Sequence, residues 1–394
     1  MFRRLDAGLP KDPIYPTTLE GLGYALCFLP LHVSLTTNSY FVNEQDEIRN
    51  KENHKAYFKY FLTKNERYNI MQREAMNEAI RNIISERLTS LGLTKIRLPL
   101  NVEENSPNVP IFISSDLKTK KRVLILFYEQ NQDLGVFAHR IIGGQGGINV
   151  GSAIDMVKYI QHLPNSPGII LANIGQLLWC RRGRKAVTQT SWMALPQKSA
   201  VELPYRIDIE NNTVPGNRNT AEHVEYIFNH VVENLCDPTS KLDVIGVGEG
   251  AVKVAEFLAK KEIWKRWGGR MEAFAAIATY YHASDNENAD FARWLRRRGR
   301  AFLVSQEPCG AFLAGPAGKK LIPAHGCPVF SLGEPYYTET MLPKGYRTVV
   351  DWFQVVSKVT EYVNPAFAFE SDSDEEEEID TPGINFDRVD QIAD

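Results

Sequence analysis

An apolar run that ends in closely spaced glycines constrains this chain more than any other stretch. Residues 242–250 read Leu-Asp-Val-Ile-Gly-Val-Gly-Glu-Gly, and residues 251–258 continue with a helical pattern of apolar positions. This order predicts a strand, a tight turn and a helix. Glycine-rich turns of this kind occur in many α/β folds, so the segment taken alone indicates the fold class and no chemistry.

The spacing of these glycines matches the turn that carries the nucleophile in α/β-hydrolases, Gly-x-Ser-x-Gly. Gly246 and Gly250 take the outer positions, but Gly248 stands where the serine would be, and a glycine has no side chain to attack a carbonyl. Glu249 is a candidate general base, although a carboxylate is also favoured in the first turn of a helix. We therefore predict a degenerate elbow with no catalytic residue.

Alternating apolar runs and helical patterns extend this interpretation to most of the chain. Strands are expected at residues 95–100, 109–114, 123–128, 168–174, 274–280, 301–305 and 328–332, and helices at residues 65–91, 153–163, 220–235, 290–300 and 345–363. The alternation predicts an α/β-hydrolase-like, mostly parallel sheet flanked by helices. We expect an N-terminal extension at residues 1–64, this domain at 65–363, and a disordered acidic tail at 364–394.

The rest of a hydrolytic triad is not where this fold needs it. A histidine should follow the last strand, yet the sequence there reads Gly333-Glu334-Pro335-Tyr336-Tyr337; His325 precedes that strand and His282 follows an earlier one. The glycine-rich loop at residues 143–147 lacks the lysine and serine of a P-loop and the spacing of a dinucleotide fingerprint. The histidines have no metal-ligand spacing. We expect no catalytic, cofactor or metal site.

Composition limits the possible partners. A net charge of −3 gives no overall attraction for nucleic acid, so we expect no direct sequence-specific nucleic-acid binding. Five scattered cysteines without a Cys-x-x-Cys pair favour a reducing compartment. The apolar block at residues 24–33 is too short to span a bilayer and contains Pro30, and no signal peptide opens the sequence, so we expect no membrane association.

Two basic clusters and one acidic tract are candidates for binding or modification. Arg181, Arg182, Arg184 and Lys185 follow a predicted strand, where ligands of open α/β sheets bind, and are possible partner contacts. The second cluster lies at residues 293–300. A solvated surface is the alternative for both clusters. Ser371 and Ser373 lie in an acidic tract and are possible phosphorylation sites; a solubilising tail is the alternative.

The order of several segments resembles the Argonaute-binding protein 2 domain family. That family includes a fungal Argonaute chaperone subunit, the C-terminal domain of fungal class II histone deacetylases and metazoan cotranscriptional regulators. The resembling segments are Tyr15-Pro16-Thr17-Thr18-Leu19, Leu22-Gly23-Tyr24, Phe41-Val42-Asn43-Glu44, Arg67-Tyr68, the strand at residues 123–128, Gly135-Val136-Phe137-Ala138-His139-Arg140, and the elbow. Residues 25–40 interrupt the family pattern and look inserted. Animal members keep a serine at the position of Gly248, so no catalytic role is carried across.

The resemblance implies a non-catalytic scaffold that binds an Argonaute protein, together with a second chaperone-complex subunit. It implies work in the nucleus (and cytoplasm), in siRNA-dependent heterochromatin formation and gene silencing. Two alternatives remain open. One is a histone-binding and dimerisation module of the deacetylase type, and the other is an esterase with an unconventional base.

Overall fold

The centre of the structure is an eight-stranded sheet with the order β12-β11-β10-β9-β5-β6-β4-β3. This computed structural model describes residues 11–22, 39–103, 105–313 and 323–364. The strands of the sheet are β3 (Leu93–Leu98), β4 (Val109–Ser114), β5 (Arg122–Phe127), β6 (Gly168–Leu171), β9 (Lys241–Val247), β10 (Met271–Ile277), β11 (Gly299–Leu303) and β12 (Val329–Ser331). Only β4 runs against its neighbours, β3 and β6. This is the α/β-hydrolase arrangement, so the predicted fold class is confirmed.

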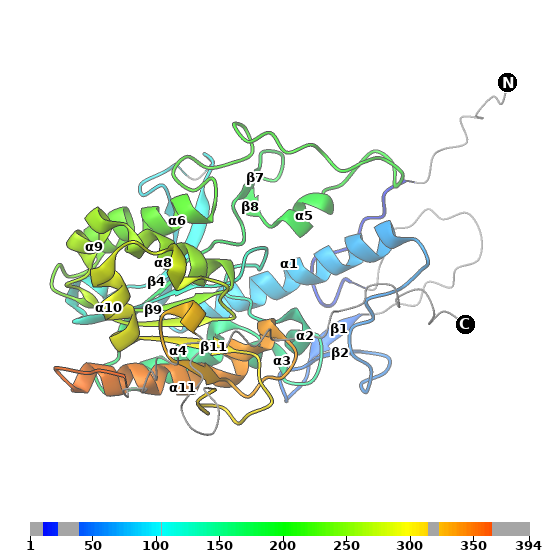
Figure 1. The fold of residues 1–394 in the computed structure, drawn as a ribbon. Coiled ribbons are helices and arrows are strands. Elements are labelled where there is room, and N and C mark those ends of the chain that lie inside the picture. Colours follow the sequence, from blue (N-terminus) through cyan, green and yellow to red (C-terminus); the bar gives the residue numbers. More distant parts are fainter. Residues whose placement is uncertain (1–10, 23–38, 104, 314–322, 365–394) are drawn as a thin grey trace, which may run out of the picture.

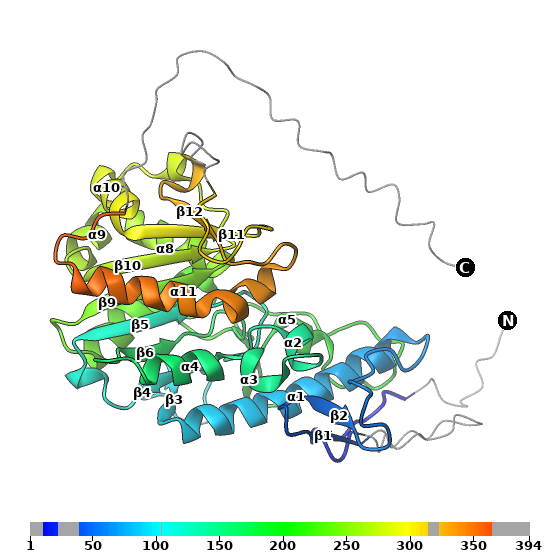
Figure 2. The same cartoon turned by 90° about the horizontal axis from the view of Figure 1, so that it is seen from below.

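Helices cover both faces of the sheet (Figures 1 and 2). One face carries α1 (Glu66–Ser90), α4 (Ala153–Gln161) and α11 (Thr338–Lys358), and the other carries α6 (Thr220–Tyr226), α8 (Glu249–Ala259), α9 (Lys261–Trp267) and α10 (Ala289–Arg298). Each layer has its own apolar core. Successive side chains of a strand point to opposite faces of the sheet. In β5, Leu124 and Leu126 therefore lie in the first core, and Val123 and Ile125 lie in the second. The central strands are therefore buried on both sides.

The long predicted helix forms as expected. Asn65 precedes α1, and its side chain accepts a hydrogen bond from the N–H of Arg67. Gly92, with a φ of 83°, follows the helix. The helix predicted at residues 220–235 is also present, as α6, a π-helical turn at Ile227–Val232 and α7 (Glu233–Leu235). Shorter helical segments are η1 (Leu117–Thr119), α2 (His139–Ile142), α3 (Gly147–Val150), α5 (Gln189–Met193), η3 (Ala283–Asp285) and η4 (Pro323–His325).

The last helix starts earlier than predicted. We expected it at residues 345–363, but α11 spans Thr338–Lys358 and contains Pro343. A proline lacks the N–H that would bond to the carbonyl four residues earlier, here that of Glu339. The hydroxyl of Tyr128, the residue after β5, lies 3.0 Å from this carbonyl and 2.9 Å from the carbonyl of Phe137, and its one hydrogen is shared between the two. A partner from a distant strand therefore compensates for the proline inside the helix.

The N-terminal region packs on the first core. Strands β1 (Tyr40–Val42) and β2 (Ile48–Asn50) form a separate hairpin, and Leu22, Tyr40 and Ile48 are buried with the residues of α1. The N–H of Tyr40 donates to the carbonyl of Leu19 at 2.8 Å, so these two positions lie side by side. Of the predicted insertion at residues 25–40, all but Ser39 and Tyr40 lie outside the described residues, as does the predicted tail after Asn364.

A second hairpin was not predicted from the sequence. Strands β7 (Leu178–Cys180) and β8 (Lys185–Val187) pair antiparallel between β6 and α6. Figure 1 places this hairpin and α5 beside α1. Short apolar stretches on both sides of a glycine-containing turn were the available signal, because that pattern is typical of a hairpin.

Among the described residues, no helix has the length and apolar character needed to cross a bilayer.

Candidate functional site

The predicted strand–turn–helix lies at the carboxyl edge of the sheet. Gly248 connects β9 to α8 with φ 52° and ψ −121°, a conformation that side chains rarely adopt. Its N–H donates to the carbonyl of Ile277 at 2.9 Å, which fixes the turn against β10. The central strands β5 and β9 lie side by side here, and the chain continues from them in opposite directions across the sheet. Open α/β sheets bind ligands at such a switch point.

The two outer glycines allow α8 to approach the sheet closely. A Cβ at Gly246 would overlap the backbone of Ala251, and a Cβ at Gly250 would overlap the carbonyl of Phe127. Any larger residue at either position would push the start of α8 away from β5 and β9. The spacing of the glycines is thus explained by packing alone and does not require a reaction.

A carboxylate fills the space that a side chain at position 248 would need. A Cβ built on Gly248 would overlap the carboxylate of Glu129, which follows β5. Burial, and then the negative charges of Glu249 and Glu339, raise the pKa of the Glu129 carboxyl above its ordinary value. Sequence reasoning missed Glu129 because the residue belongs to no motif. Its position depends on the adjacency of β5 and β9.

Glu249 is held by neighbouring side chains. It lies in the first turn of α8, accepts a hydrogen bond from the hydroxyl of Tyr280, and has the ammonium of Lys253 at 3.7 Å. The same hydrogen bond raises the pKa of Tyr280 to about 12. These contacts fit the expected role of a carboxylate at a helix N-terminus.

The loop after β12 holds a structural carboxylate where a hydrolase would have its histidine. Glu334 is 2% exposed and accepts hydrogen bonds from the N–H groups of Tyr336 and Tyr337, the hydroxyl of Thr340 and the ammonium of Lys344. Burial would raise its pKa, but these donors outweigh that effect and hold the pKa at about 2. Glu334 therefore anchors the start of α11.

His325 and the loop after β5 also make structural contacts. His325 is buried, with Nδ1 3.0 Å from the carbonyl of Tyr281. Arg140, in α2, pairs with Glu339 of α11 at 3.0 Å and lies over the ring of Tyr337. In the described part of the chain, no group of three or more acidic, histidine or cysteine residues is arranged to hold a metal ion.

The first basic cluster lies in the β7–β8 turn, and this corrects the expected position at the end of a strand of the main sheet. Its residues point to different neighbours. Arg181 Nη1 lies 3.5 Å from the Asn211 side-chain oxygen, and Arg182 Nη1 lies 3.4 Å from the Tyr205 hydroxyl. Arg184 Nη1 lies 3.3 Å from the side-chain oxygen of Asn105, and Lys185 pairs with Glu78 at 2.6 Å.

The second basic cluster contributes to packing. Arg298 pairs with Glu272 at 2.6 Å, and the guanidinium of Arg300 lies over the rings of Phe330 and Trp352. Internal partners thus hold these two cations.

An apolar groove of about 730 Å³ opens beside the first cluster, between α1, the β7–β8 turn, α5 and the N-terminal segment. Its wall includes Tyr15, Met71, Trp192 and Tyr205, and Arg181, Arg182 and Arg206 also line it. Aromatic residues, methionine and arginine are the types enriched at protein–protein contacts. Sequence reasoning found the arginines but not the groove, because its walls come from five separate segments of the chain.

Comparison with known proteins assigns the family. The family model described as "Arb2 domain" matches residues 33–309. The chain belongs to the Arb2 domain family. The predicted resemblance is confirmed, and membership supports an Argonaute-binding role in general terms. The folded domain extends beyond the matched residues, because β12 belongs to the same sheet and α11 packs in the same core.

Solved structures with a similar fold include several esterases. They are a thermostable carboxyl esterase from Bacillus coagulans (8% identity, 52% of this chain and 50% of the esterase, TM-score 0.25), a bacterial heroin esterase (12%, 72% and 91%, 0.32) and a fungal esterase from Rhizomucor miehei (11%, 72% and 90%, 0.32). The chain thus spans half of the first of these proteins. At such identities and scores the likenesses say nothing about activity. No curated protein matches the chain.

Proposed function

We propose that this Arb2 domain is a non-catalytic scaffold that binds an Argonaute protein directly. The observation that carries the proposal is membership in the family, over residues 33–309. The glycine at position 248, with the Glu129 carboxylate beside it, supports the loss of catalysis. A second chaperone subunit, siRNA-dependent heterochromatin formation and a nuclear (and cytoplasmic) location belong to the same proposal.

The apolar groove is the surface that fits such a partner best. A stretch of exposed apolar side chains continues from its rim: Val201 is 63% exposed, Leu203 88%, Ile207 42% and Ile209 68%. These four side chains lie in one short segment, and exposed apolar side chains beside a groove are typical of protein-binding sites. Tyr205, which lines the groove, belongs to the same stretch. The positive charges of Arg181 and Arg182 would orient the partner and raise the rate of association more than they would raise the affinity.

Co-precipitation with and without nuclease tests direct binding. We expect Argonaute to stay bound after RNA is digested. Leu203→Asp should weaken the complex by on the order of tenfold or more, because a charge would replace an apolar contact. Arg182→Glu should weaken it by about 1 kcal/mol, and more at low salt. The matched control is Lys118→Glu, an exposed lysine of η1 outside the groove.

Two results would contradict direct binding: Argonaute missing from the precipitate, or its release by nuclease. Retention of histones by the same bait after nuclease, without Argonaute, would favour the histone-binding alternative. If all three variants weakened the complex equally, a general charge effect rather than the groove would explain the binding.

A hydrolase assay tests the loss of catalysis. We expect no hydrolysis of short acyl esters above background, because glycine at position 248 supplies no nucleophile. The informative variants are Glu129→Gln and Glu249→Gln, which remove the two carboxylates nearest the elbow. Activity that co-purifies with the protein and disappears in either variant would establish the esterase alternative.

A further inference from the structure

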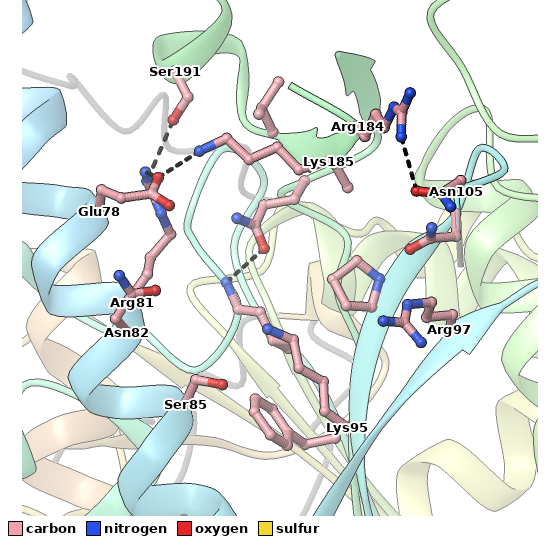
Figure 3. Close-up of a pocket in the computed structure, with 17 residues that line it drawn as sticks. Glu78, Arg81, Asn82, Ser85, Lys95, Arg97, Asn105, Arg184, Lys185 and Ser191 are labelled. Atoms are coloured by element: carbon pink, nitrogen blue, oxygen red, sulfur yellow. Dashed lines mark hydrogen bonds and ion pairs between the residues drawn. The ribbon is translucent and has the colours of Figure 1, made fainter. Parts of the chain in front are cut away.

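A second cavity, separate from the elbow, lies between the β7–β8 hairpin, α1 and the strands β3 and β4. This basic pocket has a volume of about 530 Å³ and is enclosed by α1, β3, β4 and the hairpin. Figure 3 shows Arg81 and Glu78 on the wall formed by α1, Lys95 and Arg97 on the opposite side, and Arg184 with Lys185 at the hairpin. Five cationic side chains and one carboxylate, that of Glu78, line it.

The carboxylates near the pocket are already engaged. Arg81 binds Glu74 at 2.6 Å, Glu78 at 2.5 Å and Asp133 at 3.0 Å, so its charge is neutralised within the protein. Lys185 shares the carboxylate of Glu78, at 2.6 Å. These ion pairs fix the wall between α1 and the hairpin, and Glu78 is the one carboxylate among the described residues that line the pocket.

Two cations of the pocket contact neutral groups. Lys95 lies 5.7 Å from the centre of the Phe112 ring, and Arg184 Nη1 lies 3.3 Å from the amide oxygen of Asn105. Enclosure, and then the charge of Arg97, lower the pKa of the Lys95 ammonium. Lys95 and Arg97 are two residues apart on β3, so they project from the same face of the strand toward the cavity.

We propose that the basic pocket binds a small molecule that carries a phosphate group and has about the size of a nucleotide. Phosphate accepts hydrogen bonds in several directions, which suits donors that converge from a strand and a hairpin. Asn82, Ser85 and Asn105 add neutral polar groups to the same cavity. The volume falls within the range of about 300–1,000 Å³ that is usual for small-molecule sites.

A small ligand fits this cavity better than a nucleic acid chain. Proteins that bind single strands use extended basic grooves with stacking aromatic rings. Here the one aromatic ring of the lining, Phe112, is 1% exposed and Lys95 covers it.

Isothermal titration of the full chain with AMP, pyrophosphate and adenosine tests the assignment. We expect AMP and pyrophosphate to bind with a Kd below about 1 mM and adenosine not to bind. Lys95→Ala and Arg184→Asn should each weaken binding by on the order of tenfold, since each removes a charged donor. Asparagine suits position 184 because its φ is 48°. Lys95→Arg should retain binding, and Lys118→Ala should match the unmodified protein.

Several outcomes would overturn the proposal. They are no binding of either phosphate compound, equal binding of adenosine and AMP, or the same loss in Lys118→Ala as in Lys95→Ala. Binding of a 5′-phosphorylated RNA or a phosphopeptide, with no binding of AMP and pyrophosphate, would assign the pocket to a macromolecule. Melting temperatures of the variants separate loss of ligand from loss of fold: a variant that keeps the melting temperature of the unmodified protein but no longer binds AMP has lost a ligand contact.

Discussion

At the scale of single residues, the elbow divides into a part that the sequence predicts and a part that it does not. Gly248 was identifiable because a fixed spacing of glycines defines the turn. Glu129 was not identifiable from the sequence, because it lies far from Gly248 along the chain. The two residues meet only because β5 pairs with β9. The sequence of the elbow alone does not indicate which loop of the folded sheet lies next to it.

Replacement of Gly248 by serine should therefore destabilise the protein and yield no hydrolase. The positive φ at position 248 is unfavourable for any residue with a side chain, and a Cβ there would overlap the carboxylate of Glu129. We therefore expect the free energy of unfolding to fall by about 1–3 kcal/mol. Urea denaturation measures this loss. Two controls separate its causes: Gly92→Ser has the positive φ with open space around it, and Gly269→Ser has neither problem. An equal loss of stability in Gly248→Ser and Gly92→Ser would contradict a cost from the overlap with Glu129.

At the scale of elements, the alternation of apolar runs and helical patterns was enough to predict the sheet and most helices. The misjudged elements depended on distant partners. Helix α11 starts before Pro343. The hydroxyl of Tyr128 lies 3.0 Å from the carbonyl of Glu339, and Glu334 accepts hydrogen bonds from the N–H groups of Tyr336 and Tyr337, directly before the helix. The β7–β8 hairpin, with three residues in each strand, is too short for a periodic signal.

The contribution of Glu334 to α11 should depend on pH. Its folded-state pKa of about 2 lies below the ordinary value of 4.5, so its stabilising effect is fully present above pH 4.5 and is lost as the pH falls toward 2. We expect Glu334→Gln to lower the free energy of unfolding by about 1–3 kcal/mol at pH 7, and the difference from the unmodified protein to shrink by pH 3. Urea denaturation at both pH values measures it.

The neighbouring Glu339→Gln is a matched control for this experiment. Its carboxylate is 34% exposed and pairs with Arg140, so its loss should cost less than about 1 kcal/mol. A pH-independent difference for Glu334→Gln would show that packing, and not the charge of the carboxylate, anchors the helix.

At the scale of the whole molecule, the described fold ends at a residue that is tied to the sheet. Asn364 is 3% exposed; its N–H donates to the carbonyl of Arg297, and its amide donates to the carbonyls of Arg296 and Gly299. These bonds connect the end of the described chain to α10 and to the start of β11. The sequence predicted a domain boundary near this position from the charge run that follows, but it gave no sign of the contacts that fix it.

Removal of residues 370–394 should leave the folded domain intact. The sequence there has no apolar periodicity that could offset an ordering cost of roughly 1 kcal/mol or more per residue. We expect the melting temperature to change by less than about 1 °C, whereas Asn364→Ala should lower it by several degrees, because buried carbonyls would lose donors worth about 1–3 kcal/mol in total. Differential scanning calorimetry of the two variants compares these effects directly. A drop of several degrees in the melting temperature of the truncated protein would mean that residues 370–394 pack on the domain. An unchanged melting temperature of Asn364→Ala would show that the contacts of Asn364 do not fix the end of the domain.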